Sequence, residues 1–304
     1  MHKIFNNLSA QILLLTIIGT LGAATMVTGV KFLSGNLHPF VIAFFRCFFG
    51  LIIVLPFALR NKFKAIKTNN FKIHLLRSVI NCVSILTWFT AIGLMPLEKA
   101  TALGFTTPLF ATLLAVIILK ERIKIHRTLA VIIGFFGVIL IIRPGHIDVG
   151  MGTYLMIGAS ISWAFVLIII KQLSKSDSSL TIIFYMLLIM SPILFLFAIP
   201  FWQNPSLKEL FIFFGMGISG FVAHLCLVQS LRIADTTLVM PFQYLKLIWA
   251  SIIGYIIFFE KPDLLTWIGG TIVFIAVLYI TYRENIYKKE SHKKIVTVRP
   301  SMET

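Results

Sequence analysis

Two basic side chains stand inside long apolar stretches of the sequence, where charged residues are rare. Lys246 lies near the centre of segment 235–258, and Arg46 lies nearly as deep in segment 38–59. A cation in the middle of a bilayer costs roughly 2.5–3.5 kcal/mol on insertion scales, so both side chains should face the protein interior or a watery cavity. Two interpretations stay open for Lys246: it bonds a carbonyl or hydroxyl of the protein, or it binds a carboxylate or phosphate of a ligand. Arg46 is either a structural clamp or a second ligand contact.

Polar and aromatic residues share helical faces with these positions. Asn81 and Trp88 are seven residues apart, as are neighbours on one face of a helix, and Gln243 precedes Lys246 by three. Polar stripes of this kind should point inward in lipid, and aromatic rings offer flat surfaces for a substrate that carries a ring or a cation. The predicted substrate-binding set is Lys246, Gln243, Tyr244, Asn81, Trp88, Trp163 and Arg46. Arg77, near the end of its apolar segment, is expected to snorkel to the interface.

Ion coupling has few candidate residues in this sequence. All 11 acidic residues fall in loops, termini or segment ends, which lowers the case for coupling through a buried carboxylate. His224 is either a proton relay or a hydrogen bonder that packs helices. Pro108 and Pro241 interrupt two apolar segments, and such helix breaks point to a site near the middle of the membrane.

The elements that carry these residues read as transmembrane helices. Hydrophobic residues make up 58% of the chain and charged residues 12%, against about 25% charged in soluble domains. Lipid offers no water to backbone groups, and no alternating barrel pattern is visible, so the spans must be helices. The expected fold is an all-α membrane protein with ten transmembrane helices, at 10–31, 38–59, 73–94, 97–119, 127–143, 150–171, 178–201, 210–231, 235–258 and 264–282.

The formal net charge of +16 is explained by membrane topology rather than by a nucleic-acid partner. Most of the 27 Lys and Arg residues fall on the face that both termini share, which the positive-inside rule assigns to the cytoplasm. We therefore expect a multi-pass protein of the inner membrane with both termini cytoplasmic. Residues 284–304 form a polar, basic tail on that side.

An internal repeat divides the chain in two. Sliding the sequence by 139 residues aligns 105–141 with 244–280, with Glu121 falling on Glu260 and Ala111 on Ala250. The expected halves are 1–143 and 144–283, each of five helices. Because five is odd, the second half enters the membrane from the opposite side, and inverted halves can exchange conformations around a shared central site.

These features resemble the drug/metabolite transporter superfamily, EamA type, over about 1–283. The resemblance is carried by the ten spans in two halves and by the sequences FFRCF at 44–48, LKER at 119–122 and FFEK at 258–261. The segments HPFVIAFFR at 38–46 and QYLK at 243–246 are also similar to S-adenosylmethionine carriers of intracellular bacteria. The resemblance implies a secondary transporter that works by alternating access.

The predicted function is transport of a small polar metabolite, with S-adenosylmethionine or a similar amphoteric compound as the first candidate. An exporter of amino acids or drugs is the alternative. An intramembrane enzyme is a distant one, because Gly217–Gly220 reads G-x-S-G, but His224 lies about 140° around the helix from that serine. We expect no enzymatic activity, no cofactor and no metal. The expected partners are a small-molecule substrate and the lipid bilayer, with no nucleic acid, and homodimer formation stays open.

Overall fold

The computed structural model describes most of the chain, and every regular element of the described residues is a helix. The described residues are 2–59, 66–104, 106–107, 109–111, 113–114, 125–142, 150–233, 243, 245–260, 263–276 and 278–279. The two predicted helix breaks, Pro108 and Pro241, and the predicted aromatic contact Tyr244 lie outside them.

The helices follow the predicted segments closely wherever both can be compared. In the first half of the chain they are α1 (His2–Leu33), α2 (Pro39–Leu59), α3 (Phe71–Gly93), α4 (Leu97–Gly104) and α6 (Ile125–Ile142). In the second half they are α7 (Met151–Leu173), α8 (Ser179–Ala198) with the short 3₁₀ helix η2 (Ile199–Phe201), α9 (Leu207–Ile233), α11 (Leu245–Phe258) and an apolar helix at Leu264–Ala276.

Six described helices are long and apolar enough to cross a membrane: Leu14–Leu33, Pro39–Leu59, Phe71–Gly93, Met151–Leu173, Ser179–Phe201 and Leu207–Ile233. They match the first three and the sixth to eighth predicted spans. Shorter apolar helices lie within the fifth, ninth and tenth predicted spans, at Ile132–Ile141, Ile248–Phe258 and Leu264–Ala276. The chain is therefore a multi-pass, all-helical membrane protein over its described residues.

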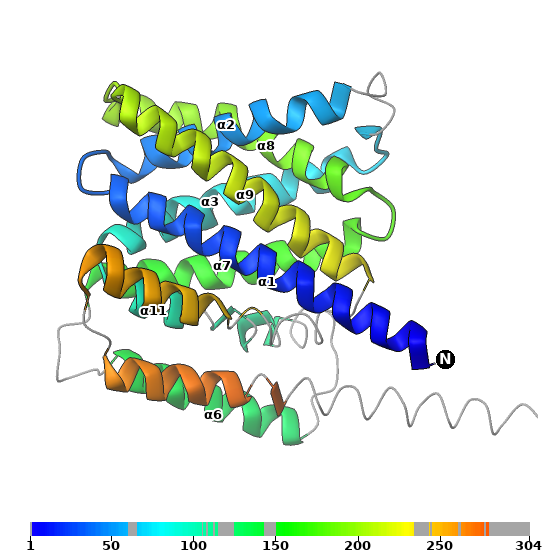
Figure 1. Cartoon of the computed structure of the whole chain (residues 1–304), viewed down its shortest axis with the longest axis vertical. Coiled ribbons are helices and arrows are strands. Elements are labelled where there is room, and N and C mark those ends of the chain that lie inside the picture. Colours follow the sequence, from blue (N-terminus) through cyan, green and yellow to red (C-terminus); the bar gives the residue numbers. More distant parts are fainter. Residues whose placement is uncertain are drawn as a thin grey trace, which may run out of the picture.

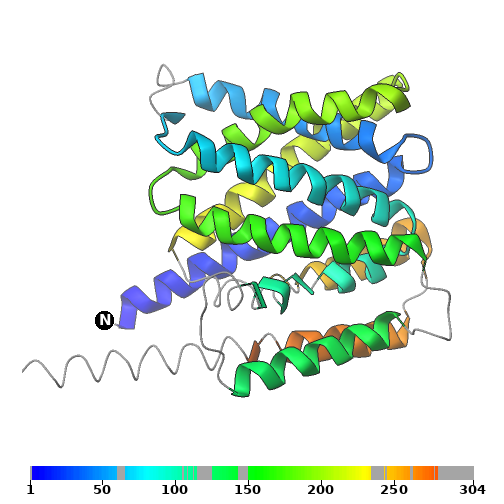
Figure 2. The same cartoon turned by 180° about the vertical axis from the view of Figure 1, so that it is seen from behind.

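The helices are stacked across the long axis of the molecule. Helices α2, α8 and α9 lie at one end, α1, α3 and α7 in the middle, and α6 with the helix at 264–276 at the other end (Figures 1 and 2). Close approach of α1 to α9 rests on small residues: a Cβ added to Gly22 would lie 3.0 Å from the carbonyl oxygen of Ser219. Glycine at such seams lets helix backbones meet in lipid, where no hydrophobic force drives them together.

Helix contacts recur when the two halves are exchanged. Helix α1 packs on α9 as α7 packs on α3, and α1 meets α11 as α7 meets α4. Helices α2 and α8, and likewise α4 and α11, contact each other directly. This exchange of contacts is what two repeats related by an axis in the membrane plane would give.

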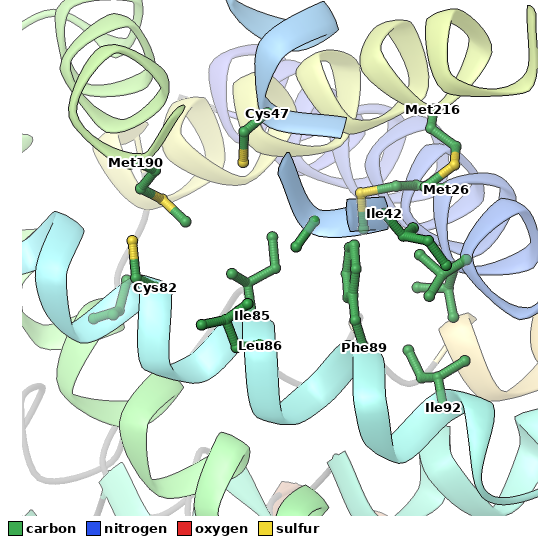
Figure 3. Close-up of a cluster of buried hydrophobic side chains, with 14 of the residues drawn as sticks. Met26, Ile42, Cys47, Cys82, Ile85, Leu86, Phe89, Ile92, Met190 and Met216 are labelled. Carbon is green, nitrogen blue, oxygen red and sulfur yellow. The ribbon is translucent and has the colours of Figure 1, made fainter. Parts of the chain in front are cut away.

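A buried apolar cluster joins the two halves beside the middle of the bundle. The part labelled in Figure 3 comes from α1, α2 and α3 and from α8 and α9, and several of its members carry sulfur, including Met26, Cys47, Cys82, Met190 and Met216. The three cysteines are free thiols. Soft, adaptable side chains of this kind fill irregular gaps between helices.

Candidate functional site

A cavity of about 170 Å³ lies between the two halves. Its walls come from α1, α2, α3 and α4 on one side and from α7, α9 and α11 on the other. A site at the contact of two repeats is where a carrier that alternates between two conformations must hold its substrate.

The cavity gathers every described residue of the predicted site. Arg46, Asn81, Trp88, Trp163, His224, Gln243 and Lys246 all line it. These residues come from six different helices or segments, so no pattern within a single helix could predict that they meet. The geometry brings the set together; the part that each residue takes in binding stays a prediction.

Arg46 is buried against sulfur and nitrogen acceptors. Its side chain is 3% exposed, its Nε donates to Sδ of Met26 at 3.3 Å, and its Nη1 donates to Sγ of Cys47 at 3.5 Å. Nη2 lies 3.3 Å from Nδ1 of His224. Thioethers and thiols are weak acceptors for a guanidinium, so an oxygen anion in the cavity would be a stronger partner than those that these contacts supply.

Gly220 makes room for this guanidinium. A Cβ at Gly220 would lie 2.9 Å from Nη2 of Arg46 and 3.1 Å from Sδ of Met26, and one at Gly217 would lie 3.1 Å from the backbone nitrogen of Gly50. The G-x-S-G sequence thus brings the backbone of α9 close to α2. Between the two glycines, the hydroxyl of Ser219 donates to the carbonyl of Met216 in its own helix, at 3.3 Å.

His224 links the guanidinium to a ring and to its own helix. Its Nδ1 is 3.0 Å from the carbonyl oxygen of Gly220, and its ring meets the Trp163 ring edge-on with centroids 6.0 Å apart. Nδ1 either donates to that carbonyl or accepts from Arg46, and cannot do both in one tautomer. A change of tautomer at His224 therefore changes how firmly Arg46 is held.

Asn81 and the neighbouring hydroxyl residues tie the cavity walls together. Asn81 is 5% exposed, and its Nδ2 donates to Sδ of Met190 at 3.3 Å. The hydroxyl of Ser84 donates to the carbonyl of Ala159 at 3.2 Å, which joins α3 to α7. Ser84 lines the cavity while bonding across helices, as hydroxyl residues at helix seams commonly do.

The prediction that Arg77 snorkels to the interface is wrong. Its side chain is fully buried; its Nη1 donates to the carbonyl of Ile182 at 2.9 Å and its Nη2 to Sδ of Met186 at 3.5 Å. Although Arg77 continues the stripe of Asn81 and Trp88, it does not line the cavity. It instead joins α3 to α8, because the guanidinium reaches a carbonyl of the neighbouring helix before it reaches the headgroups.

The charges around the cavity are of one sign. Arg46 and Lys246 line it, and no aspartate or glutamate stands among the described residues that do. Trp88 and Trp163, which are only partly buried, supply aromatic surface. Chemically, the arrangement suits a ligand with a carboxylate or phosphate at one end and a ring or a cationic group that can lie against aromatic faces.

The cradle of Arg46 was missed by sequence reasoning. Met26 and Gly220 look like ordinary apolar residues of long helices, and the contact between them joins α1 to α9. No periodicity within one helix signals such a contact. One signal was available in the sequence. An arginine deep in an apolar segment, such as Arg46, needs space between helices for its planar guanidinium when no carboxylate partner is present.

Comparisons with known proteins agree with this architecture. The model of the EamA-like transporter family matches the chain twice, at residues 10–143 and 150–282. The S-adenosylmethionine uptake transporter of Rickettsia prowazekii is 34% identical over 263 residues, which are 86% of this chain and 90% of that protein. The riboflavin transporter of Vibrio cholerae is 30% identical over 238 residues, 77% of this chain and 80% of that protein.

One solved crystal structure has the same fold, with a TM-score of 0.64 at 15% sequence identity, and the match covers 88% of this chain and 96% of that one. The fold defines a multi-pass membrane protein with a cavity between its two halves. The chain belongs to the EamA-like transporter family.

Proposed function

We propose that this chain is a secondary transporter that moves S-adenosylmethionine, or a metabolite with a similar arrangement of charges, across the inner membrane by alternating access. The observation that carries the proposal is the convergence of Arg46, Lys246, Trp88 and Trp163 on one cavity between the halves. The similarity to the S-adenosylmethionine uptake transporter of Rickettsia prowazekii supports the choice of substrate.

The chemical groups of S-adenosylmethionine can be paired with groups that line the cavity. S-adenosylmethionine carries a carboxylate, which the ammonium of Lys246 and the guanidinium of Arg46 can bind. Its adenine ring can stack on a tryptophan, and its sulfonium can lie against an aromatic face. Asn81 and Gln243 supply amide groups that orient the polar ends.

Ten transmembrane helices in two inverted halves, 1–143 and 144–283, are part of the proposal. The twofold match of the family model and the exchange of helix contacts between halves support it. The proposed topology has both termini in the cytoplasm and the tail 284–304 on the same side. Reporters fused in the loops 61–72 and 120–126 and at the C-terminus should read cytoplasmic, whereas reporters at 144–149 and 202–207 should read external.

Riboflavin is the second candidate, because the Vibrio cholerae riboflavin transporter is also similar over most of the chain. Riboflavin would use the tryptophan faces but has no carboxylate for the two cations. Export of amino acids or drugs remains a further alternative for the same cavity.

Counterflow in proteoliposomes tests the proposal. Vesicles preloaded with unlabelled S-adenosylmethionine should accumulate the labelled compound transiently, which a carrier does and a channel does not. Riboflavin, methionine and S-adenosylhomocysteine, each added in excess outside, rank the competing substrates. Absence of counterflow with S-adenosylmethionine, together with counterflow of one competitor, would transfer the assignment to that compound.

A further inference from the structure

A cluster of charged and backbone groups lies where α1, α3 and α11 end and α4 begins, and we call this the Lys31 end of the bundle. The cluster does not include the cations of the cavity, Arg46 and Lys246. Nζ of Lys31, in the last turn of α1, donates to the carbonyls of Met95 at 2.6 Å and Ile92 at 3.3 Å, and it lies 3.5 Å from Oε1 of Glu260. The other oxygen of Glu260, Oε2, accepts a hydrogen bond from the backbone nitrogen of Leu97 at 2.9 Å. We call these contacts the Glu260 latch.

The latch ties the second half of the chain to three elements of the first. Glu260 follows α11, and its partners are Lys31 at the end of α1 and Leu97 at the start of α4. Lys31 in turn bonds the carbonyls at the end of α3 and just beyond it. Both of its oxygens are used, and the side chains of Lys31 and Glu260 are each 17% exposed. A half-buried carboxylate with an ammonium and an amide as partners holds its position more firmly than an exposed ion pair does.

The backbone around Glu260 is shaped to place its carboxylate there. Phe259 has φ 55°, which is uncommon for an aromatic residue, and this turn lets the nitrogen of Glu260 bond to the carbonyl of Gly254 at 3.1 Å. Gly254 also leaves room for the side chain, since a Cβ there would lie 3.0 Å from Oε2 of Glu260. Phe259 itself is 84% exposed, so packing of its ring does not explain the turn.

The latch borders the cavity at Leu97. Leu97, whose nitrogen binds Glu260, lines the cavity together with Ala100 and Thr101 of the same helix. Movement of α4 away from α11 would therefore break the bond to Glu260 and open the cavity wall at the same place.

The opposite end carries the matching lysine contact. Lys171, in the last turn of α7, donates through Nζ to the carbonyl of Leu231 near the end of α9, at 2.7 Å. With the halves aligned, α7 corresponds to α1 and α9 to α3, so this bond repeats the one from Lys31 to Ile92. The same contact thus joins equivalent helices at both ends of the bundle.

We propose that the Glu260 latch is a gate that holds the cavity closed at the Lys31 end and breaks once in each transport cycle. The gate rests on the proposed function in one respect, which is that the cavity opens alternately to the two sides. Because a contact that forms in only one of two close conformations biases the balance between them, removal of the latch should shift that balance toward the open state.

Access to the cavity from the Lys31 end measures the gate without any substrate. Ala100→Cys, in a background where Cys47 is replaced by serine and Cys82 and Cys226 by alanine, places a thiol in the cavity wall. A membrane-impermeant maleimide is added from outside to vesicles whose orientation is fixed by labelling of Gly35→Cys, at an exposed position beyond α1. The rate of labelling reports opening at this end.

Glu260→Gln and Lys31→Met should each raise the labelling rate by about fivefold, because each removes the ion pair between the two side chains. Glu209→Gln is the matched control, because Glu209 caps its own helix through Ser206 and a glutamine can do the same. It should label at the parent rate. Phe259→Gly should lower the labelling rate. Glycine adopts φ 55° without steric cost, so this variant should fold and should favour the closed latch.

The gate is overturned if Glu260→Gln labels at the parent rate, if Glu209→Gln raises labelling equally, or if Phe259→Gly labels faster than the parent. These results are separate from the substrate assignment. A labelling response without counterflow of S-adenosylmethionine would keep the gate and remove the substrate, whereas counterflow with unchanged labelling in all variants would keep the substrate and remove the gate.

Discussion

Nη2 of Arg46 lies 3.3 Å from Nδ1 of His224, and this contact joins α2 of the first half to α9 of the second. Both residues line the cavity, and both depend on the bare backbone of α9 at Gly220. The guanidinium of Arg46 belongs to the first half, whereas His224 and Gly220, which hold it in place, belong to the second. Relative movement of the halves would therefore shift the guanidinium of Arg46, which we propose as a substrate contact.

Gly220→Ala should disturb Arg46 directly. The added Cβ would lie 2.9 Å from Nη2, so the guanidinium must move, and we expect a loss of about 1–3 kcal/mol in the free energy of unfolding together with weaker substrate binding. Gly215→Ala is the control in the same helix, because nothing lies within 4 Å of its added Cβ. Thermal unfolding in detergent checks both variants. Equal melting temperatures for the two would mean that the cradle of Arg46 adapts freely.

Gly137→Ala and Gly269→Ala should weaken the packing of α6 on the helix at 264–276. Each added Cβ would meet the carbonyl oxygen of the other glycine, at 2.7 Å and 2.6 Å respectively, and backbone atoms cannot move aside as a flexible side chain can. We expect a lower melting temperature for both variants. Gly158→Ala, where nothing lies within 4 Å, should unfold like the parent. Unchanged melting in Gly137→Ala would contradict this packing.

Trp88→Ala and Trp163→Ala should weaken substrate binding more than folding. Both rings are only partly buried and line the cavity, so a ligand can use surface that the helices do not need. Ligand titration alongside melting separates the two effects. Phe89→Ala is a useful comparison, because that ring is fully buried in the apolar cluster and its loss should lower stability first. Parallel loss of stability and binding in the tryptophan variants would favour a packing role.

His224→Gln tests the proton relay suggested by the sequence. A relay predicts that the substitution abolishes any acceleration of uptake by an imposed proton gradient, while counterflow, which needs no net proton movement, continues. Glutamine can still accept a hydrogen bond from Arg46, so the position of the guanidinium should survive. Gradient-driven uptake that persists in His224→Gln would leave this residue with the positioning of Arg46 alone.

The spans could be predicted because membrane helices are defined locally. Long apolar stretches bounded by polar loops predict α2, α3 and α8 to within a few residues, since each helix must satisfy its own backbone in lipid. Contacts between helices are not encoded locally. The stripe through Asn81 and Trp88 indicated the correct inward face, but the prediction that Arg77 snorkels was wrong, because only tertiary packing places Arg77 against α8.

The contacts of the Glu260 latch could not be predicted from the sequence either. The sequence marked Glu260 as the counterpart of Glu121 by the internal repeat, and Glu121 lies outside the described residues. Spacing along the chain gave no reason to join Glu260 to Lys31, which is far away in sequence and in the other half. Their contact depends on the left-handed turn at Phe259 and on the space at Gly254, which are features of the folded chain.

Lys246→Met should remove a charge from the cavity while keeping most of the packing of the side-chain stem. Lys246 lines the same cavity as Arg46, and no carboxylate stands among the described lining residues, so we propose a substrate carboxylate as the partner of the two cations. We expect stable insertion, near-normal expression and at least about tenfold weaker binding of S-adenosylmethionine, which corresponds to about 1.4 kcal/mol. Equilibrium titration of the purified protein measures the change.

The methyl ester of S-adenosylmethionine shows whether Lys246 holds the carboxylate. Esterification should weaken binding to the parent protein and make little further difference to Lys246→Met, because the two changes remove one interaction. The same comparison of the two ligands with Arg46→Met shows how much each cation contributes to binding of the carboxylate. If the parent and Lys246→Met lose equal affinity on esterification, Lys246 does not bind the carboxylate. The lysine would then bond carbonyl or hydroxyl groups within the bundle, and Arg46 would be the remaining cation for the substrate.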